Sequence, residues 1–259
     1  MNITKKSFSI VTGATGGLGK AISDSILNKE GNLLFVARDL QKINSYVDTV
    51  EQSKRPLLFN IQSDLSKEED LQNTEKLIIE IIRNNNDIKE VFLFNNASII
   101  DPISLIKDVN FKDISNALVL NIAAAYTLTS TLIRLKLNKP SLKIYIINIS
   151  SGVSLNAVKG WSAYCISKAG LNMLSKCIAI ENETDDIFSL SINPGAIDTG
   201  MQEKIRNADS LSIPATKKFE TMYNEGKLQK PNDVADKLFR ILASLDYSNG
   251  DFIDFNKIN

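Results

Sequence analysis

The sequence contains no histidine, so any proton chemistry that it carries out has to use other side chains. Cysteine is scarce as well, with only Cys165 and Cys177. If one helix carries both, their separation of twelve residues places them about 18 Å apart, too far for a disulfide bond. We therefore expect two reduced thiols.

Net charge and long apolar runs are also missing. Thirty basic and thirty acidic residues cancel, so no overall field favours nucleic acid or an anionic membrane as a partner. The chain passes from a short polar lead into an expected strand without the apolar core of a signal peptide, and no later run approaches the ~20 apolar residues that span a bilayer. We expect a cytoplasmic protein. Its 259 residues, 43% of them hydrophobic, fit a single α/β domain with a large core.

A glycine-rich turn lies near the N-terminus, between an expected strand at residues 8–11 and a helix with apolar residues at positions 18, 22 and 26. The turn has glycine at positions 13, 17 and 19. Such glycines let the chain turn sharply and let a pyrophosphate approach the helix N-terminus, where unpaired N–H groups favour anions. Glycine clusters alone usually mark loops, but a position between a strand and a helix predicts a dinucleotide site.

The next expected strand, residues 32–38, ends in Ala37 and Arg38. An NAD-binding fold usually has a carboxylate near this strand end to bind the ribose 2′-hydroxyl, whereas a guanidinium pairs with a 2′-phosphate. The sequence therefore favours NADP(H) as the cofactor. The alternative is that Arg38 merely meets Asp39 or solvent.

The alternation continues with expected strands at residues 56–61 and 91–94. Asp64, just past the first, either meets the adenine ring or begins a helix for which Ser66 and Glu69 form a capping box. Asn96 follows the second strand, where its amide either ties neighbouring strands together or lines the cofactor trough.

A long helical region is expected at residues 111–137, and it carries Asn121 among apolar residues. A buried amide needs hydrogen-bond partners. Asn121 is therefore either a satisfied core residue or part of a proton relay through water.

The stretch from Ser151 to Lys168 holds the expected catalytic set. A strand at residues 143–149 brings Ser151 to the ligand edge of the sheet, while Tyr164 and Lys168 stand four residues apart on one helix face. A nearby ammonium favours the phenolate, so we expect Lys168 to lower the pKa of Tyr164. Tyr164 then acts as a general acid, and the Ser151 hydroxyl holds a substrate carbonyl oxygen. A tyrosine and a lysine at this spacing more often only decorate a helix surface, so the other motifs have to decide.

The last third of the chain is expected to close the sheet. After a strand at residues 188–192, Pro194 and Gly195 turn the chain, and Thr199 either binds a nicotinamide carboxamide or is a loop hydroxyl. Residues 200–230 are irregular, so we expect a substrate lid at about residues 197–230. Asn232 is the expected N-cap of a helix running to about residue 245, before a final strand at 250–255. The whole pattern predicts one doubly wound, Rossmann-type parallel sheet with helices on both faces.

These motifs resemble, in order and spacing, those of the short-chain dehydrogenase/reductase family over nearly the whole chain. The stretches around Tyr164 and Thr199 look most like benzil reductases and sepiapterin reductases, which reduce one carbonyl of a vicinal dicarbonyl with NADPH. The resemblance implies that Tyr164 donates the proton and that Ser151 binds the carbonyl. It also implies that Lys168 binds the nicotinamide ribose and that Asn121 supports a water relay. The cofactor-binding residues that it implies, with no metal ligand among them, are Gly13, Thr15, Gly17, Leu18, Gly19, Arg38, Asp64, Asn96, Ala97, Tyr164, Lys168, Pro194, Gly195, Ile197 and Thr199.

Two positions depart from the family pattern. Ser98 replaces a glycine and slightly crowds the cofactor trough, and Gly16 stands where many NADP-dependent members have a basic residue. The second departure leaves Arg38 as the main expected partner of a 2′-phosphate.

The resemblance implies a small-molecule carbonyl substrate and a homodimer or homotetramer, for which residues 123–132 and 171–178 offer apolar helix faces. Alternatives are an alcohol dehydrogenase, a 3-oxoacyl reductase and an NADP-sensing regulator without turnover. A 3-oxoacyl reductase whose partner is an acyl carrier would favour a basic patch near the lid, for which the candidates are Lys204, Arg206, Lys217 and Lys218.

Overall fold

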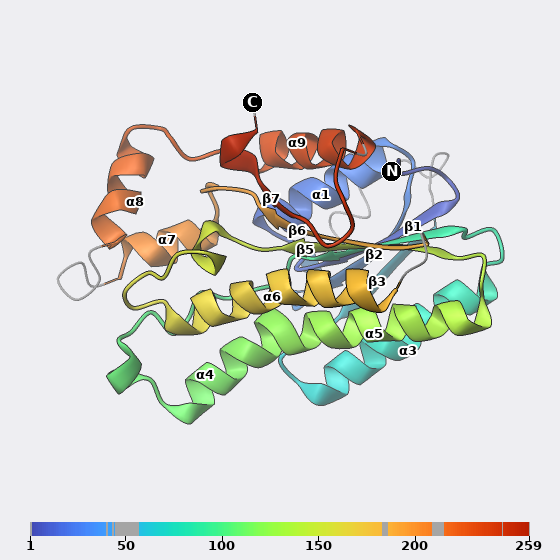
Figure 1. Cartoon of the computed structure of the whole chain (residues 1–259), viewed down its shortest axis with the longest axis horizontal. Coiled ribbons are helices and arrows are strands. Elements are labelled where there is room, and N and C mark those ends of the chain that lie inside the picture. Colours follow the sequence, from blue (N-terminus) through green and yellow to red (C-terminus); the bar gives the residue numbers. More distant parts are fainter. Residues whose placement is uncertain are drawn as a thin grey trace.

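The computed structural model describes residues 2–39, 41–42, 44, 57–182, 186–208, 215–244 and 246–258. A central sheet lies between two layers of helices (Figure 1). Within the described residues the strands are all parallel and pair in the order β3-β2-β1-β4-β5-β6-β7. The strands are β1 Ser7–Thr12, β2 Asn32–Ala37, β3 Leu58–Gln62, β4 Glu90–Asn95, β5 Lys143–Ile149, β6 Ile187–Asn193 and β7 Phe252–Asp254. The α-helices are α1 Gly17–Asn28, α3 Glu68–Asn84, α4 Phe111–Leu118, α5 Ala124–Asn138, α6 Ser162–Glu181, α7 Gly200–Arg206, α8 Ala215–Asn224 and α9 Pro231–Ser244.

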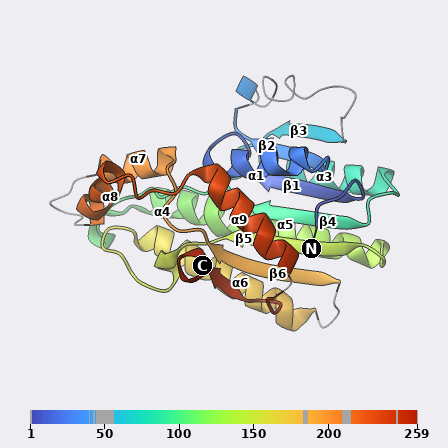
Figure 2. The ribbon, with the colours of Figure 1, turned by 90° about the horizontal axis from the view of Figure 1, so that it is seen from above.

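The central strands are apolar on both faces because helices cover both sides of the sheet. Figures 1 and 2 show α1 and α9 on one face, and α3, α5 and α6 on the other. On β1, Val11 packs into the core under α1 and α9, while its neighbour Ile10 packs into the core under α5 and α6. This arrangement confirms the predicted doubly wound sheet.

The strand order reverses between β1 and β4, because the chain builds β2 and β3 on one side of β1 and then crosses to the other. In such sheets ligands bind beyond the carboxyl ends of the strands at the reversal. The ends of β1, β2, β4 and β5 therefore form the edge on which a site is expected.

Two predicted helix starts are wrong. Helix α3 begins after Lys67, and the Ser66 hydroxyl bonds Asp64 instead of capping the helix. Helix α9 begins at Pro231, so Asn232 lies inside its first turn. Proline suits the first helical position because the N–H that it lacks would have no partner there. Pro56 and Leu245, the outer limits of two predicted elements, lie outside the described residues.

The segment expected to be irregular contains two helices, α7 and α8. Residues 209–214 between them lie outside the described part of the chain. Beyond α8 the chain returns to the sheet edge, where Gln229 and Ile197 form a parallel β-bridge. The final strand, β7, is shorter than predicted and leads into a 3₁₀ turn at Phe255–Lys257.

The helical region of α4 and α5 is continuous through a π-helical turn at Val119–Ala123. Contrary to our expectation from the sequence, Phe111–Asn138 is long and apolar enough to cross a membrane, with a mean hydropathy of 1.4 in its most apolar window. Half of that window is buried, and Leu128 and Leu132 pack in the core against the sheet. These contacts are those of a core helix.

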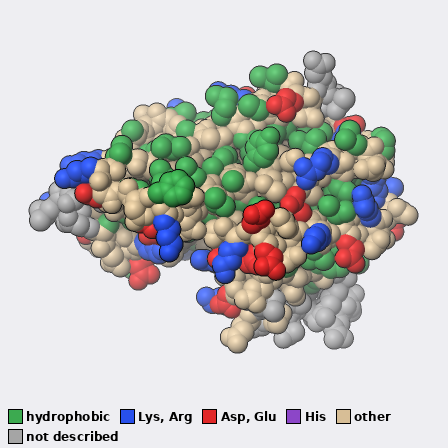
Figure 3. Space-filling view, turned by 90° about the horizontal axis from the view of Figure 1, so that it is seen from below, with side chains coloured by type: hydrophobic (Ala, Val, Ile, Leu, Met, Phe, Trp, Pro, Cys, Tyr) green, Lys and Arg blue, Asp and Glu red, His purple; other side chains and the backbone are tan. Residues whose placement is uncertain are grey.

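Apolar side chains also remain on the outer surface of this helical layer (Figure 3). Phe111 on α4, Tyr126 on α5 and Ile180 on α6 are 85%, 60% and 77% exposed. Helix α6 also carries both cysteines as free thiols, which confirms that prediction.

Candidate active site

The glycine turn after β1 is shaped by backbone contacts. Gly13 and Gly17 have φ of +67° and +50°, a conformation that favours glycine. A Cβ on Gly19 would lie 2.2 Å from the Gly13 carbonyl oxygen, so α1 packs directly on the turn. No side chain caps the N-terminus of α1 after Gly16, which leaves its first N–H groups available to an anion.

Asn96 ties the ends of β1 and β4 together. Its Nδ2 donates to the Thr12 carbonyl at 2.8 Å, and the backbone N–H groups of Asn96 and Ala97 both donate to Thr12 Oγ1 at 3.0 Å. Of the two predicted roles, the structure shows the structural one for the Asn96 amide. Ala97, by contrast, lines the adjoining pocket.

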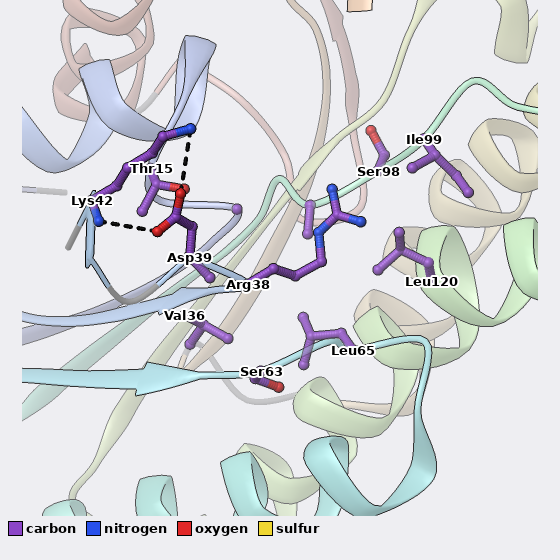
Figure 4. Close-up of a pocket in the computed structure, with 13 residues that line it drawn as sticks. Thr15, Val36, Arg38, Asp39, Lys42, Ser63, Leu65, Ser98, Ile99 and Leu120 are labelled. Atoms are coloured by element: carbon purple, nitrogen blue, oxygen red, sulfur yellow. Dashed lines mark hydrogen bonds and ion pairs between the residues drawn. The ribbon is translucent and has the colours of Figure 1, made fainter.

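A pocket of about 550 Å³ opens beside the glycine turn (Figure 4). The Arg38 side chain extends into it, while Asp39 turns the other way and pairs with Lys42 at 3.4 Å. Asp39 therefore pairs with Lys42 and not with Arg38, which contradicts one half of the predicted alternative, whereas Arg38 is exposed to solvent, as the other half has it. The lining residues are Gly13, Thr15, Val36, Ala37, Arg38, Asp39, Lys42, Ser63, Leu65, Ala97, Ser98, Ile99 and Leu120.

Asp64 serves as a turn residue. Its carboxylate accepts hydrogen bonds from the Ser66 hydroxyl at 2.7 Å and from the Ser66 backbone N–H at 3.2 Å. Burial raises the pKa of Asp64, but these hydrogen bonds and the positive charge of Arg38 outweigh it, so the pKa lies below its ordinary value. Ser63 and Leu65, on either side, line the pocket, whereas Asp64 is not among the lining residues.

Asn121 lies in the π-helical turn and is buried. Its Oδ1 accepts from the Ile99 N–H and its Nδ2 donates to the Ile99 carbonyl, both at 2.8 Å. Nδ2 also donates to Ser167 Oγ on α6 at 3.1 Å. The amide is a satisfied core group that holds the loop after β4 against α6, and a role in a proton relay stays a prediction.

Tyr164 and Lys168 lie buried on one face of α6, beside the loop that carries Ser151. Lys168 Nζ donates to the Ile149 carbonyl at 2.7 Å and lies 5.4 Å from the centre of the Tyr164 ring. The three predicted catalytic side chains therefore converge where β5 ends.

The predicted lowering of the Tyr164 pKa by Lys168 is wrong for the protein alone. Burial raises the pKa of Tyr164 above its ordinary value, and hydrogen bonding with Ser151 lowers it by less. Burial also lowers the pKa of Lys168, to about 7. Tyr164 is thus held in its protonated form at neutral pH, and Lys168 is no longer a permanent cation.

Comparison with known families accounts for this combination of glycine turn and buried tyrosine and lysine. A family model described as short chain dehydrogenase matches residues 8–210. The chain belongs to the short-chain dehydrogenase family. Its members are oxidoreductases that use NAD(P)(H).

Individual relatives of this dehydrogenase align over nearly their full length. It is 30% identical to a benzil reductase ((S)-benzoin forming) of Bacillus cereus, in an alignment of 246 residues that covers 94% of this chain and 97% of the relative. It is 27% identical over 257 residues to a sepiapterin reductase of Rattus norvegicus, covering 96% of both chains. Among solved structures, the KRED1-Pglu enzyme superimposes with a TM-score of 0.79 at 26% identity, over 95% of this chain and 99% of that one.

The turn after β6 closes the site of the dehydrogenase from the other side. Gly195 has φ of +83°, and the Gln229 side chain fills the space beside it and donates to the Pro194 carbonyl at 2.9 Å. Thr199 lies against Gly17, because a Cβ there would come within 2.8 Å of the Thr199 methyl group. Ile197, in contrast, is buried in the core under α1 and α9.

An apolar cluster surrounds Tyr164 on the side of α7 and α8. The Trp161 ring stacks on Phe219 with centroids 5.4 Å apart and meets Tyr164 edge-on at 6.4 Å. Ile205 of α7 packs into the same cluster. The sequence reasoning missed Trp161 and Phe219, as well as Ser63, Leu65 and Leu120 of the pocket. Trp161 carried a usable signal, because it stands directly before α6 and only three residues before Tyr164.

Proposed function

We propose that this dehydrogenase is an NADPH-dependent carbonyl reductase that reduces one carbonyl of a vicinal dicarbonyl. The observation that carries the proposal is the convergence of Ser151, Tyr164 and Lys168 at the sheet edge, beside an apolar cluster. The resemblance to benzil and sepiapterin reductases, both named for carbonyl reduction, supports the choice of substrate.

The residues at the glycine turn fit a dinucleotide. The backbone at Gly13 and Gly19 has no room for side chains, and the uncapped start of α1 can bind a pyrophosphate. Arg38 reaches into the pocket and can pair with a 2′-phosphate, while the neighbouring carboxylate in the chain, Asp39, is held by Lys42. When bound, NADPH supplies the hydride.

The side chains of the chain itself supply the proton and orient the ketone. Tyr164, which is protonated at neutral pH, donates its proton to the ketone oxygen as negative charge develops there. The Ser151 hydroxyl donates a hydrogen bond to the same oxygen. Lys168, whose pKa is about 7, can return a proton toward Tyr164 at neutral pH and binds the nicotinamide ribose.

The apolar cluster selects the substrate, with α7 and α8 as the lid at about residues 197–230. Trp161 and Phe219 favour an uncharged, aromatic ketone. Of the four basic residues of the acyl-carrier alternative, Lys204 pairs with Asp101 at 2.7 Å and Arg206 stacks on Tyr223, while Lys217 and Lys218 are exposed on α8.

We also propose that this single-domain enzyme is a cytoplasmic homodimer or homotetramer. The exposed apolar side chains of α5 and α6 would then pack between subunits (Figure 3). Light scattering that gives a strict monomer would contradict this.

The test of the proposed function is the loss of NADPH absorbance in the presence of benzil, run in parallel with NADH. We expect rapid oxidation of NADPH and slow oxidation of NADH. Equal rates would overturn the coenzyme assignment. Tight NADPH binding without turnover of any 1,2-diketone would overturn the substrate class and favour the sensing alternative.

A further inference from the structure

Asn172 lies on the same face of α6 as the two reactive side chains of that helix. Tyr164, Lys168 and Asn172 are spaced four residues apart, so their side chains follow one another along the helix. Asn172 is only 8% exposed, and a buried amide is retained at little cost only if its polar atoms are satisfied. Its hydrogen-bond partners therefore indicate its role.

Both partners of the Asn172 amide flank Ser151 in the chain. Oδ1 accepts from Ser150 Oγ at 2.6 Å, and Nδ2 donates to Ser154 Oγ at 2.7 Å. The Ser151 carbonyl oxygen in turn accepts two hydrogen bonds, from Ser154 Oγ at 2.6 Å and from the Ser154 backbone N–H at 3.0 Å. The amide thus holds the loop on both sides of Ser151.

The hydrogen bonds of this chain all run in one direction. Ser150 donates to Asn172, Asn172 to Ser154, and Ser154 to the Ser151 backbone. Such chains polarise and strengthen each of their members. A hydroxyl has only one proton. Ser154 can therefore donate to the Ser151 carbonyl only while its other neighbour, Asn172, donates to it or makes no demand on its proton.

We propose that Asn172 is a positioning residue that fixes the Ser151 hydroxyl relative to Tyr164, through Ser150 and Ser154. The inference rests on the proposed function, in which Ser151 binds the ketone oxygen. Because the amide and the proton donor share one helix, α6 sets the position of the carbonyl-binding group as well as that of the acid.

The decisive variant is Asn172→Asp, which keeps the shape and the acceptor for Ser150. A carboxylate cannot donate to Ser154 and instead attracts its proton, so the bond to the Ser151 carbonyl is lost. We expect kcat for diketone reduction to fall about 10- to 100-fold, since small displacements of a catalytic group have effects of this size. The dissociation constant of NADPH should change less than about twofold, as α6 does not lose Lys168.

Two further substitutions keep the test independent of a buried charge. Ser154→Ala should lower kcat in the same way, whereas Ser154→Thr, which retains the hydroxyl, should restore most of it. Ser175→Ala is the matched control. Its hydroxyl is buried on the same helix, but it bonds Asn148 and Ser191 rather than the Ser151 loop, so kcat should stay near the wild-type value.

A double-mutant cycle with Ser151→Ala tests the coupling directly. In the Ser151→Ala background, Asn172→Asp should cause no further loss of kcat. Multiplicative losses, or a wild-type kcat in Asn172→Asp and Ser154→Ala, would overturn the inference. Failure of the proposed function looks different, because wild type would then reduce no diketone or Ser151→Ala would retain full turnover.

Discussion

The glycine turn and the lid are constructed differently. At the turn, backbone atoms set the geometry, as at Gly19, where there is no space for a Cβ. In the lid, α7 and α8 rest on Tyr164 through side chains, with Phe219 stacked on Trp161 and an exposed ion pair between Lys204 and Asp101. Backbone packing tolerates few residue types, whereas side-chain packing tolerates many of similar size. The coenzyme end therefore depends on individual residue types, and the substrate end depends mainly on apolar composition.

The largest effect is expected where backbone meets backbone. Gly19→Ala places a methyl group 2.2 Å from the Gly13 carbonyl oxygen, which neither segment can avoid without moving α1. We expect a loss of about 3 kcal/mol in the free energy of unfolding, together with a loss of coenzyme affinity. Urea unfolding and a fluorescence titration with NADPH measure both.

Gly16→Ala is the matched control for this substitution, because a Cβ there meets nothing within 4 Å. It should remain near wild type in both measurements. Equal damage from the two substitutions would show that the turn is sensitive to any added side chain and not to backbone contact.

The next effect concerns coenzyme choice. Arg38→Ala removes a guanidinium that reaches into the pocket. Hydrogen bonds to charged groups contribute about 1.5–3 kcal/mol, so we expect the dissociation constant of NADPH to rise about 10- to 100-fold. Affinity for NADH should hardly change. Lys67→Ala, a nearby exposed cation, serves as the control, and a parallel loss of NADH affinity would contradict the assignment of Arg38 to the 2′-phosphate.

A smaller effect per pH unit is expected from Lys168, which lies at the ordered edge of the sheet. Its pKa is about 7 in the folded protein against 10.5 ordinarily, so between these values the unfolded chain binds more protons than the folded one. The contribution of this group to the free energy of unfolding therefore rises with pH, by about 1 kcal/mol per unit between pH 7.5 and 9.5. The free energy of unfolding of wild type minus that of Lys168→Met should rise accordingly, and a difference that does not vary with pH would contradict the assigned pKa.

The smallest effect is expected in the lid. Lys204→Ala breaks an ion pair whose partners are 58% and 49% exposed, and such pairs contribute about 0.2–1 kcal/mol. Thermal unfolding and KM for the diketone should both stay close to wild type. A large rise in KM from this substitution would show that the lid, like the turn, depends on a single polar contact.

The same contrast explains what the sequence could predict. The parallel sheet, the glycine turn and the set of Ser151, Tyr164 and Lys168 follow from local patterns with strict spacing. The structure confirms the doubly wound sheet and brings these three side chains together at its edge. The helices of the lid were missed because their apolar residues are few and scattered. The stacking of Trp161 on Phe219 joins positions far apart in the chain, which no local pattern encodes.

The Tyr164 pKa was mispredicted for a related reason. Spacing places Lys168 beside Tyr164, but the depth of burial depends on the whole fold, and burial raises the pKa of Tyr164 and lowers that of Lys168. The Ser66 capping box failed because Asp64, two residues earlier, competes for the same hydroxyl.

The central claim is that Tyr164 donates the proton, and its most direct test is Tyr164→Phe measured for diketone reduction and NADPH binding in the same samples. We expect kcat to fall on the order of 10²–10⁴, with little change in the dissociation constant for NADPH and unchanged thermal unfolding. Wild-type turnover by a Tyr164→Phe enzyme that binds NADPH normally would contradict it.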